Sequence, residues 1–231
     1  MIKIRRESDR GKADHGWLKA NHSFSFADYY DPEHMQFRSL RVLNEDYIAA
    51  RTGFPKHPHA DMEIITYVLE GELQHEDSMG NRAVIKPGEV QVMHAGTGVH
   101  HSEKNPSQDP THLLQIWILP DKSGHAPGYE QGIKLNSTHQ NRLTLIASPD
   151  GRELSSKIHQ DVRLYIGRFD ATRSIDVELK PDRHAWIQVT RGSISVNGSE
   201  LSPGDGAAIS EETKLSITAR DDSEFLLFDL A

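Results

Sequence analysis

The chain has 231 residues, with 14 histidines, no cysteine and a net charge of -8. The lack of cysteine excludes disulfides, thiolate zinc fingers and iron–sulfur clusters, and the acidic charge argues against nucleic acid as a direct partner. No apolar run approaches the roughly 20 residues of a membrane helix, and the charged N-terminus lacks the apolar core of a secretory signal. We therefore expect a soluble, cytoplasmic protein with no membrane partner.

The first half of the chain has the pattern of short strands separated by turns. Apolar and polar residues alternate over residues 40–44, and the polar residues 44–46 then predict a turn. Further strands are expected at residues 64–69, 72–76, 83–85 and 112–119, with a hairpin turn at 78–81. No helix longer than a turn or two is needed, so we predict an all-β fold.

The second half of the chain repeats the first. Residues 121–140 are rich in Gly, Pro and polar residues and predict a crossing between two lobes. Beyond it, residues 188–196 correspond to 67–75, and the Ser-Pro-Gly-Asp at 202–205 corresponds to the Lys-Pro-Gly-Glu at 86–89. We therefore expect two equivalent lobes, residues 1–125 and 126–231.

Two His-rich pairs distinguish the first copy from the second. Side chains two apart on a strand project to the same face, so each pair forms half of a possible site. Counting from the matched glycines, four positions hold His57, His59, His101 and Glu103 in the first copy and Glu178, Lys180, Ile217 and Ala219 in the second. Three imidazoles and a carboxylate suit one divalent transition metal, so we predict a metal site in the N-terminal lobe.

The carboxylate of this site is ambiguous from the residues alone. Glu63 shares strand parity with His57 and His59 and so competes with Glu103 as a ligand, although a role in orienting an imidazole is an equal alternative. Four other histidines have weaker claims, because one has the wrong parity and three lack a partner at ligand spacing: His100, His75, His94 and His112. We expect those four to serve packing or to face solvent.

At this point the motifs resemble those of a known family. The first and second cupin motifs are similar to Gly53-x3-His57-x-His59-x3-Glu63-x7-Gly71 and to Gly88-x5-His94-Ala-Gly96-Thr-Gly98-x2-His101-x3-Asn105. The closer resemblance is to the pirin branch of two-lobed cupins, because only three residues separate Gly53 from His57 and a carboxylate follows two after His101. The segments that carry it are Gly16-Trp-Leu, Phe24-Ser-Phe26-Ala-Asp-Tyr-Tyr, 54–63 and His100-His101-Ser-Glu103.

The resemblance implies a fold, a ligand set and an activity. Pirin-type proteins have two cupin-type β-barrel lobes with metal in the N-terminal one, and their ligands carry over to His57, His59, His101 and Glu103, which favours Glu103 over Glu63 by analogy. Iron(II) is the first expectation for the metal, with Zn, Cu, Co, Ni or Mn as alternatives.

Bacterial members imply quercetin 2,3-dioxygenase activity on a flavonol and O2 with release of CO, in which Glu103 would accept the hydroxyl proton. The animal branch implies the alternative, a non-catalytic metal-binding regulatory protein that acts through a protein partner. A cupin isomerase of sugar phosphates ranks last, because no Arg or Lys cluster accompanies the site. We expect a monomer, since the two lobes already pair with each other.

Overall fold

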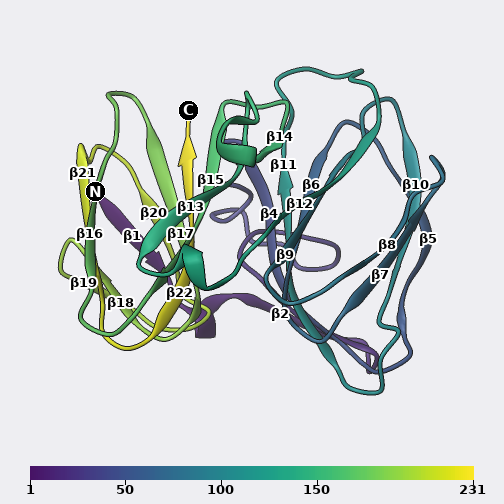
Figure 1. Ribbon diagram of the computed structural model, residues 1–231, viewed down its shortest axis with the longest axis horizontal. Helices are drawn as coiled ribbons and strands as arrows, with labels where there is room; N and C mark the ends of the chain where they lie inside the picture. Colours follow the sequence, from purple (N-terminus) through teal and green to yellow (C-terminus); the bar gives the residue numbers. More distant parts are fainter. The chain divides into compact units, whose positions relative to one another are not determined.

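The computed structural model describes residues 1–231, and the chain folds into two compact units (Figure 1). The N-terminal lobe comprises residues 11–134 and 158–160, and the C-terminal lobe comprises residues 1–10, 135–157 and 161–231. Each lobe contains one seven-stranded and one four-stranded sheet. The fold is thus the expected all-β pair of cupin-type lobes.

In the N-terminal lobe, every strand pairing is antiparallel. The seven-stranded sheet runs in the order β12 (Gly128–Lys134), β9 (Glu89–His94), β6 (Glu63–Glu70), β11 (Thr111–Ile118), β4 (Leu40–Ile48), β3 (Leu18–His22) and β2 (Gly11–Asp14). The four-stranded sheet runs in the order β5 (Gly53–His59), β10 (Val99–Lys104), β7 (Leu73–Asp77) and β8 (Arg82–Ile85).

The C-terminal lobe repeats this order of strands, except that one edge pair of its large sheet is parallel. Its large sheet runs β1 (Ile2–Arg5), β20 (Gly206–Ile209), β17 (His184–Arg191), β22 (Ser223–Leu230), β15 (Val162–Phe169), β13 (Arg142–Ser148) and β14 (Ser156–Lys157). Its small sheet runs β16 (Ser174–Glu178), β21 (Lys214–Ala219), β18 (Ile194–Val196) and β19 (Ser199–Leu201). The turns after β6 and β17 use the matched glycines Gly71 and Gly192, both at positive φ.

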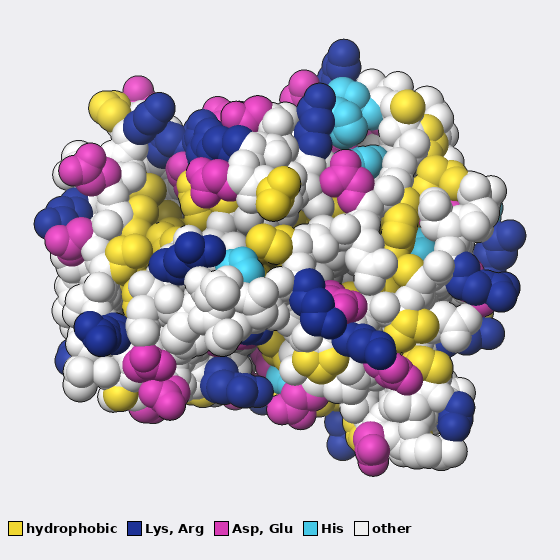
Figure 2. Space-filling model, viewed as in Figure 1, with side chains coloured by type: hydrophobic (Ala, Val, Ile, Leu, Met, Phe, Trp, Pro, Cys, Tyr) yellow, Lys and Arg dark blue, Asp and Glu magenta, His cyan; other side chains and the backbone are white.

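The helical content is limited to three 3₁₀ turns of three residues each, at Glu7–Asp9, Ser137–His139 and Arg152–Leu154. None of these could cross a membrane. On the face shown in Figure 2, Lys and Arg side chains are interspersed with Asp and Glu and do not form one basic patch.

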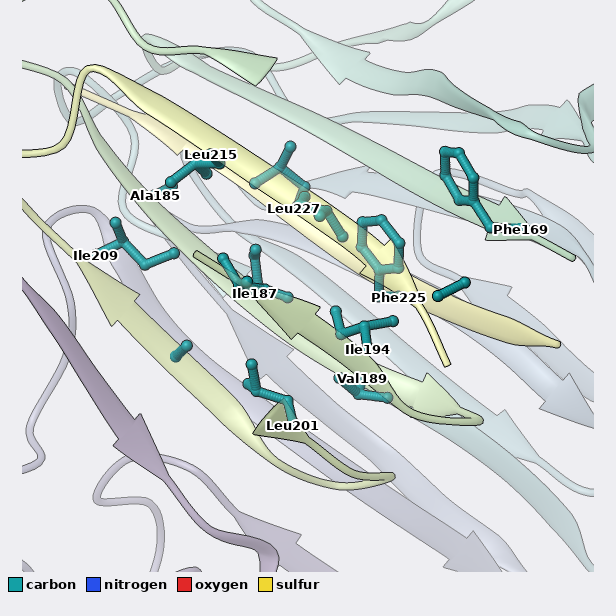
Figure 3. Packing of buried hydrophobic residues seen from close by; sticks show 14 of the residues in the cluster. Phe169, Ala185, Ile187, Val189, Ile194, Leu201, Ile209, Leu215, Phe225 and Leu227 are labelled. Atoms are coloured by element: carbon teal, nitrogen blue, oxygen red, sulfur yellow. The ribbon is translucent and has the colours of Figure 1, made fainter. Parts of the chain in front are cut away.

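Alternation along the strands places an apolar core between the two sheets of each lobe. In the C-terminal lobe, Ile187 and Val189 of β17 meet Leu215 of β21 and Ile194 of β18 (Figure 3). In the N-terminal lobe the corresponding core is formed by residues of both sheets, including Leu18, Ile48, Val68, Leu73, Ile85 and Leu113. These cores fix the strands that carry the polar residues described below.

The structure confirms the strands expected at 64–69, 72–76, 83–85 and 112–119 to within two residues at each end. The turn predicted at 44–46 is wrong, because these residues continue β4. Their polarity has another origin: Asn44 bonds the His22 ring at 2.9 Å, and Glu45 bonds His112 at 2.8 Å. A strand with polar partners on both faces does not need an apolar pattern.

The boundary between the lobes also differs from the expected 125/126. Residues 128–134 form β12, which pairs with β9 and belongs to the N-terminal lobe, and residues 1–10 belong to the C-terminal lobe through the pairing of β1 with β20. In each lobe a strand distant in sequence thus completes the edge of the large sheet. Composition cannot predict such pairing, because the Gly-rich segment resembles a linker.

Candidate metal centre

The pairing of β5 with β10 brings three imidazoles together. His57 lies opposite His101 and His59 lies opposite Val99 in the antiparallel register. The Nε2 atoms of His57 and His101 are 3.1 Å apart, and the ring of His59 lies 4.7 Å from that of His57 and 4.9 Å from that of His101. The predicted same-face projection of His57 and His59 is therefore realised.

Hydrogen bonds behind two of the rings orient their nitrogens. The Nδ1 atom of His57 lies 2.7 Å from the carbonyl oxygen of Pro55, which requires it to donate a proton and leaves a lone pair on Nε2. On the other side, His75 Nε2 lies 3.1 Å from the Asp77 carboxylate, and His75 Nδ1 lies 3.5 Å from His101 Nδ1. If His75 donates to Asp77, its Nδ1 accepts from His101, and His101 Nε2 also carries a lone pair.

Two nitrogen lone pairs 3.1 Å apart need a proton or a metal cation between them. Burial and the neighbouring imidazoles lower the pKa of His101 to about 2 and that of His59 to about 4, so these two rings stay neutral and can each offer a nitrogen lone pair. Neutral imidazoles with converging lone pairs are the form that binds metals. The three histidines therefore fit a divalent metal ion.

Glu103 also fits a metal site, through its unbalanced charge. Its carboxylate is buried and accepts hydrogen bonds from Gln115 Nε2 at 2.6 Å, Gln91 Nε2 at 3.4 Å and the Thr66 hydroxyl at 3.3 Å. All three donors are neutral, and burial raises the pKa of Glu103 to about 7. A bound cation would supply the missing positive charge.

The structure groups the four predicted ligands around His101. His57, His59 and His101 offer ligand atoms within 4.8 Å of one another, and so do His75, His101 and Glu103. Glu103 thus lies close to His101 but not to His57 and His59 of β5. Gln115 and Gln91 bond its carboxylate from the large sheet, and the pairing of β10 with β5 shifts in register between His101 and Glu103.

A cavity of about 200 Å³ opens beside these side chains, and all four predicted ligands line it. Aromatic and aliphatic side chains form most of its wall, including Phe26, Phe54, Ile64 and Trp117. His22, Asn44 and Asp46 add a polar stretch from β3 and β4. An apolar pocket with a few convergent polar groups is the usual form of a small-molecule site.

Glu63, the competing carboxylate, lies elsewhere. Ile64 and Thr66 of β6 face the pocket and Glu103, so alternation turns Glu63 to the opposite face of the large sheet. There it bonds His94 and His159. The expected shared parity with His57 and His59 fails, because β5 and β6 are separate strands in different sheets with the positive-φ residue Asp61 between them.

The other histidines divide into two groups. His100 is exposed, as its parity predicts, and His112 stacks on Tyr47 at 4.1 Å while bonding Glu45. His75 instead lies completely buried beside His101, a contact that the spacing argument missed. The alternation Leu73-His75-Asp77 along β7 could have indicated it, since Leu73 belongs to the core.

The fold and the site together define a two-lobed cupin with a candidate metal centre in its N-terminal lobe. Residues 3–118 match the family model described as "Pirin", and residues 145–230 match the "Quercetinase C-terminal cupin domain". The chain belongs to the pirin family.

Several relatives cover nearly the whole chain. The chain is 49% identical over 231 residues to the protein of Escherichia coli K12 named quercetin 2,3-dioxygenase, covering all of this chain and 99% of the relative. It is 42% identical over 222 residues to a pirin-like protein of Caulobacter vibrioides, covering 96% of each. The crystal structure of the E. coli bacterial pirin YhhW in complex with nickel(II) has a TM-score of 0.96 and 48% identity, covering all of this chain and 99% of that one.

Proposed function

We propose that this protein is a metal-dependent dioxygenase that opens flavonols such as quercetin with O2 and releases CO. The observation that carries the proposal is the pair of imidazole Nε2 atoms 3.1 Å apart, with a buried carboxylate that has no basic side chain beside it, on the wall of an apolar pocket. The name of the E. coli relative supports the reaction, and the nickel(II) complex of the bacterial pirin supports a divalent metal.

The residues that would hold the metal are His57, His59, His101 and Glu103. Iron(II) is our first choice, and Zn, Cu, Co, Ni and Mn also suit nitrogen and oxygen ligands. When bound, the metal would supply Lewis acidity towards a substrate hydroxyl oxygen and a path for electrons to dioxygen. These four ligands would leave room on the ion for an oxygen atom of the substrate.

The chain's own residues would position the substrate and move one proton. Phe26, Phe54 and Trp117 provide flat apolar walls that suit an aromatic ring and exclude water. Glu103 lines the same pocket beside His101. We assign it the role of accepting the proton of the flavonol hydroxyl, because a carboxylate at the pocket wall can act as a general base.

Anaerobic reconstitution tests this function. Metal-free protein is loaded with iron(II), then mixed with quercetin and O2, and the flavonol absorbance and the released CO are followed. We expect loss of the absorbance band and one CO per quercetin consumed. His57→Ala should abolish turnover and reduce bound metal, whereas His100→Ala, an exposed neighbour of the ligand His101, should have no effect.

Two results would overturn parts of the proposal. Unchanged turnover in His57→Ala would contradict the site. Tight metal binding without turnover for iron, copper, nickel, cobalt or manganese would contradict the reaction and support the alternative, a metal-dependent regulatory protein that binds a protein partner.

A further inference from the structure

A second group of potential ligands lies on the outer face of the large sheet in the N-terminal lobe. Glu63 and His94 face each other across β6 and β9, with 2.6 Å between Glu63 Oε2 and His94 Nδ1. The Nδ1 atom of His159 lies 3.2 Å from Glu63 Oε1. One ligand atom from each of these three residues lies within 4.8 Å of the other two.

The three side chains form a recognised type of ligand set. Two imidazoles and one carboxylate hold zinc or iron(II) in many proteins and leave at least one position for water. Metal bonds of about 2.0–2.2 Å at a tetrahedral ion place neighbouring ligand atoms roughly 3.4 Å apart. The 3.2 Å between Glu63 and His159 is close to this value, whereas the 2.6 Å between Glu63 and His94 is a hydrogen-bond distance that would lengthen when both atoms bind one ion.

The charge of Glu63 supports a cation here. Its side chain is 1% exposed, and its ion-pair partners are the two imidazoles, with no Lys or Arg among them. The buried carboxylate thus has no permanent positive charge in contact.

A metal ion could reach this cluster from solvent. The side chain of His159 is 26% exposed. Its ring stacks on that of His125 at 3.9 Å, and His125 Nε2 lies 2.6 Å from a carboxylate oxygen of Asp121, which is 56% exposed. His125 thus links an exposed carboxylate to the ring of His159, and the negative charge of Asp121 would attract a cation.

The three ligands come from segments far apart in the chain. β6 and β9 are neighbouring strands of the large sheet, whereas His159 belongs to the short segment 158–160, which rejoins the N-terminal lobe after residues 135–157. The segment is also held by hydrogen bonds from Asp121 N to His159 O at 2.7 Å and from Gln160 Nε2 to Leu119 O at 2.8 Å. A metal ion would cross-link it to the sheet and stabilise the lobe.

We propose that Glu63, His94 and His159 form a second site for a divalent transition metal, separate from the pocket site and with a structural role. The probe is zinc, titrated into metal-free protein and measured by elemental analysis after gel filtration. The starting variant is His57→Ala/His59→Ala/His101→Ala, which removes the pocket imidazoles, so failure of the proposed dioxygenase function does not affect the result.

We expect this variant to retain about one zinc per chain and wild-type protein to hold about two. Adding Glu63→Gln should remove the remaining zinc, and adding His159→Ala should weaken its binding at least ~10-fold. Zinc should raise the melting temperature of the starting variant but not after Glu63→Gln. Glutamine keeps an acceptor oxygen for the imidazoles, so the lobe should fold, and circular dichroism checks this.

His112→Gln provides a matched control, because His112 forms a similar pair with Glu45 at 2.8 Å but belongs to no three-ligand group. It should leave the zinc content unchanged. The second site is disproved if the starting variant binds no zinc, or if its zinc content is the same with and without Glu63→Gln and His159→Ala.

Discussion

At the scale of single residues, the environment of Glu103 is unusual for a carboxylate. Three neutral donors satisfy its carboxylate, yet none balances its charge. Glu63 makes the contrast clear, because it is equally buried but bonds two imidazoles and keeps a low pKa. The pKa values of the two glutamates are thus shifted in opposite directions because their hydrogen-bond partners differ. Only Glu103 lines the pocket.

The raised pKa of Glu103 predicts a pH dependence of stability in the metal-free protein. A carboxyl with a pKa of about 7 when folded and 4.5 as its reference value contributes stability that is complete below pH 4.5 and is lost as the pH rises through 7. Relative to Glu103→Gln, metal-free wild-type protein should lose free energy of unfolding across this window, with a slope of up to about 1.4 kcal/mol per pH unit.

Urea unfolding of both metal-free proteins between pH 4.5 and 8 measures this difference. The unfolding free energy of the variant is subtracted from that of wild-type protein, which removes the contributions of His59 and His101. Their lowered pKa values destabilise the folded protein as the pH falls below 6.5, which is opposite to the effect of Glu103. A difference that does not vary with pH would show that Glu103 is not enclosed as described.

At the scale of elements, the approach of β5 to β10 determines the metal centre. Gly53 opens β5 directly against the backbone of β10, where a Cβ atom would lie 2.2 Å from the carbonyl oxygen of Glu103 and 2.5 Å from Lys104 Cα. The first glycine of the motif is therefore required by close packing of two strands. Its φ angle is not positive, so backbone strain is not the reason.

Gly53→Ala should therefore separate β5 from β10 and move His57 and His59 away from His101. We expect metal affinity in the pocket to fall at least ~10-fold, because imperfect ligand geometry costs affinity, while far-UV circular dichroism shows that the strands persist. Lys56→Ala, on the exposed side of the same strand, is the control and should bind metal normally. Normal metal affinity in Gly53→Ala would contradict the required contact.

At the scale of the whole molecule, one scaffold is used twice with different interiors. Where β10 carries His101 and Glu103, β21 of the C-terminal lobe carries Ile217 and Ala219, which belong to its hydrophobic core. Phe225 completes that core by covering Gly167, whose added Cβ would lie 2.5 Å from the ring, and by stacking on Phe169 at 5.8 Å. Apolar packing thus fills the place that ligands occupy in the N-terminal lobe.

Phe225→Ala should destabilise the protein without changing its metal site. Removal of this fully buried ring should cost about 3–5 kcal/mol of unfolding free energy, measured by urea denaturation, while the folded variant keeps the metal affinity of wild-type protein. Leu154→Ala, at an 86% exposed position, should cost little. Loss of metal from folded Phe225→Ala would show that the C-terminal core supports the site.

Much of the fold could be predicted from the sequence. The strands at 64–69 and 112–119 and the two-lobe repeat follow from alternation and from matched Gly and Pro turns, because these patterns act locally along the chain. The turn expected at 44–46 was wrong, and the crossing expected at 121–140 contains the change of lobe at 134/135 but also includes the strand β12. In both, polar residues or glycines are stabilised in strands by partners distant in sequence, such as the pairing of β12 with β9.

The sequence by itself determined the class of fold, the repeat and the side-chain pairing of His57 with His59, because strand periodicity is a property of neighbouring residues. Only the tertiary structure decided that Glu63 faces away from the pocket and that His75 lies behind His101. It also brought His159 to Glu63. These outcomes depend on which strands become neighbours and which face each turns inward, and hydrogen bonds and packing between segments far apart in the chain select that arrangement.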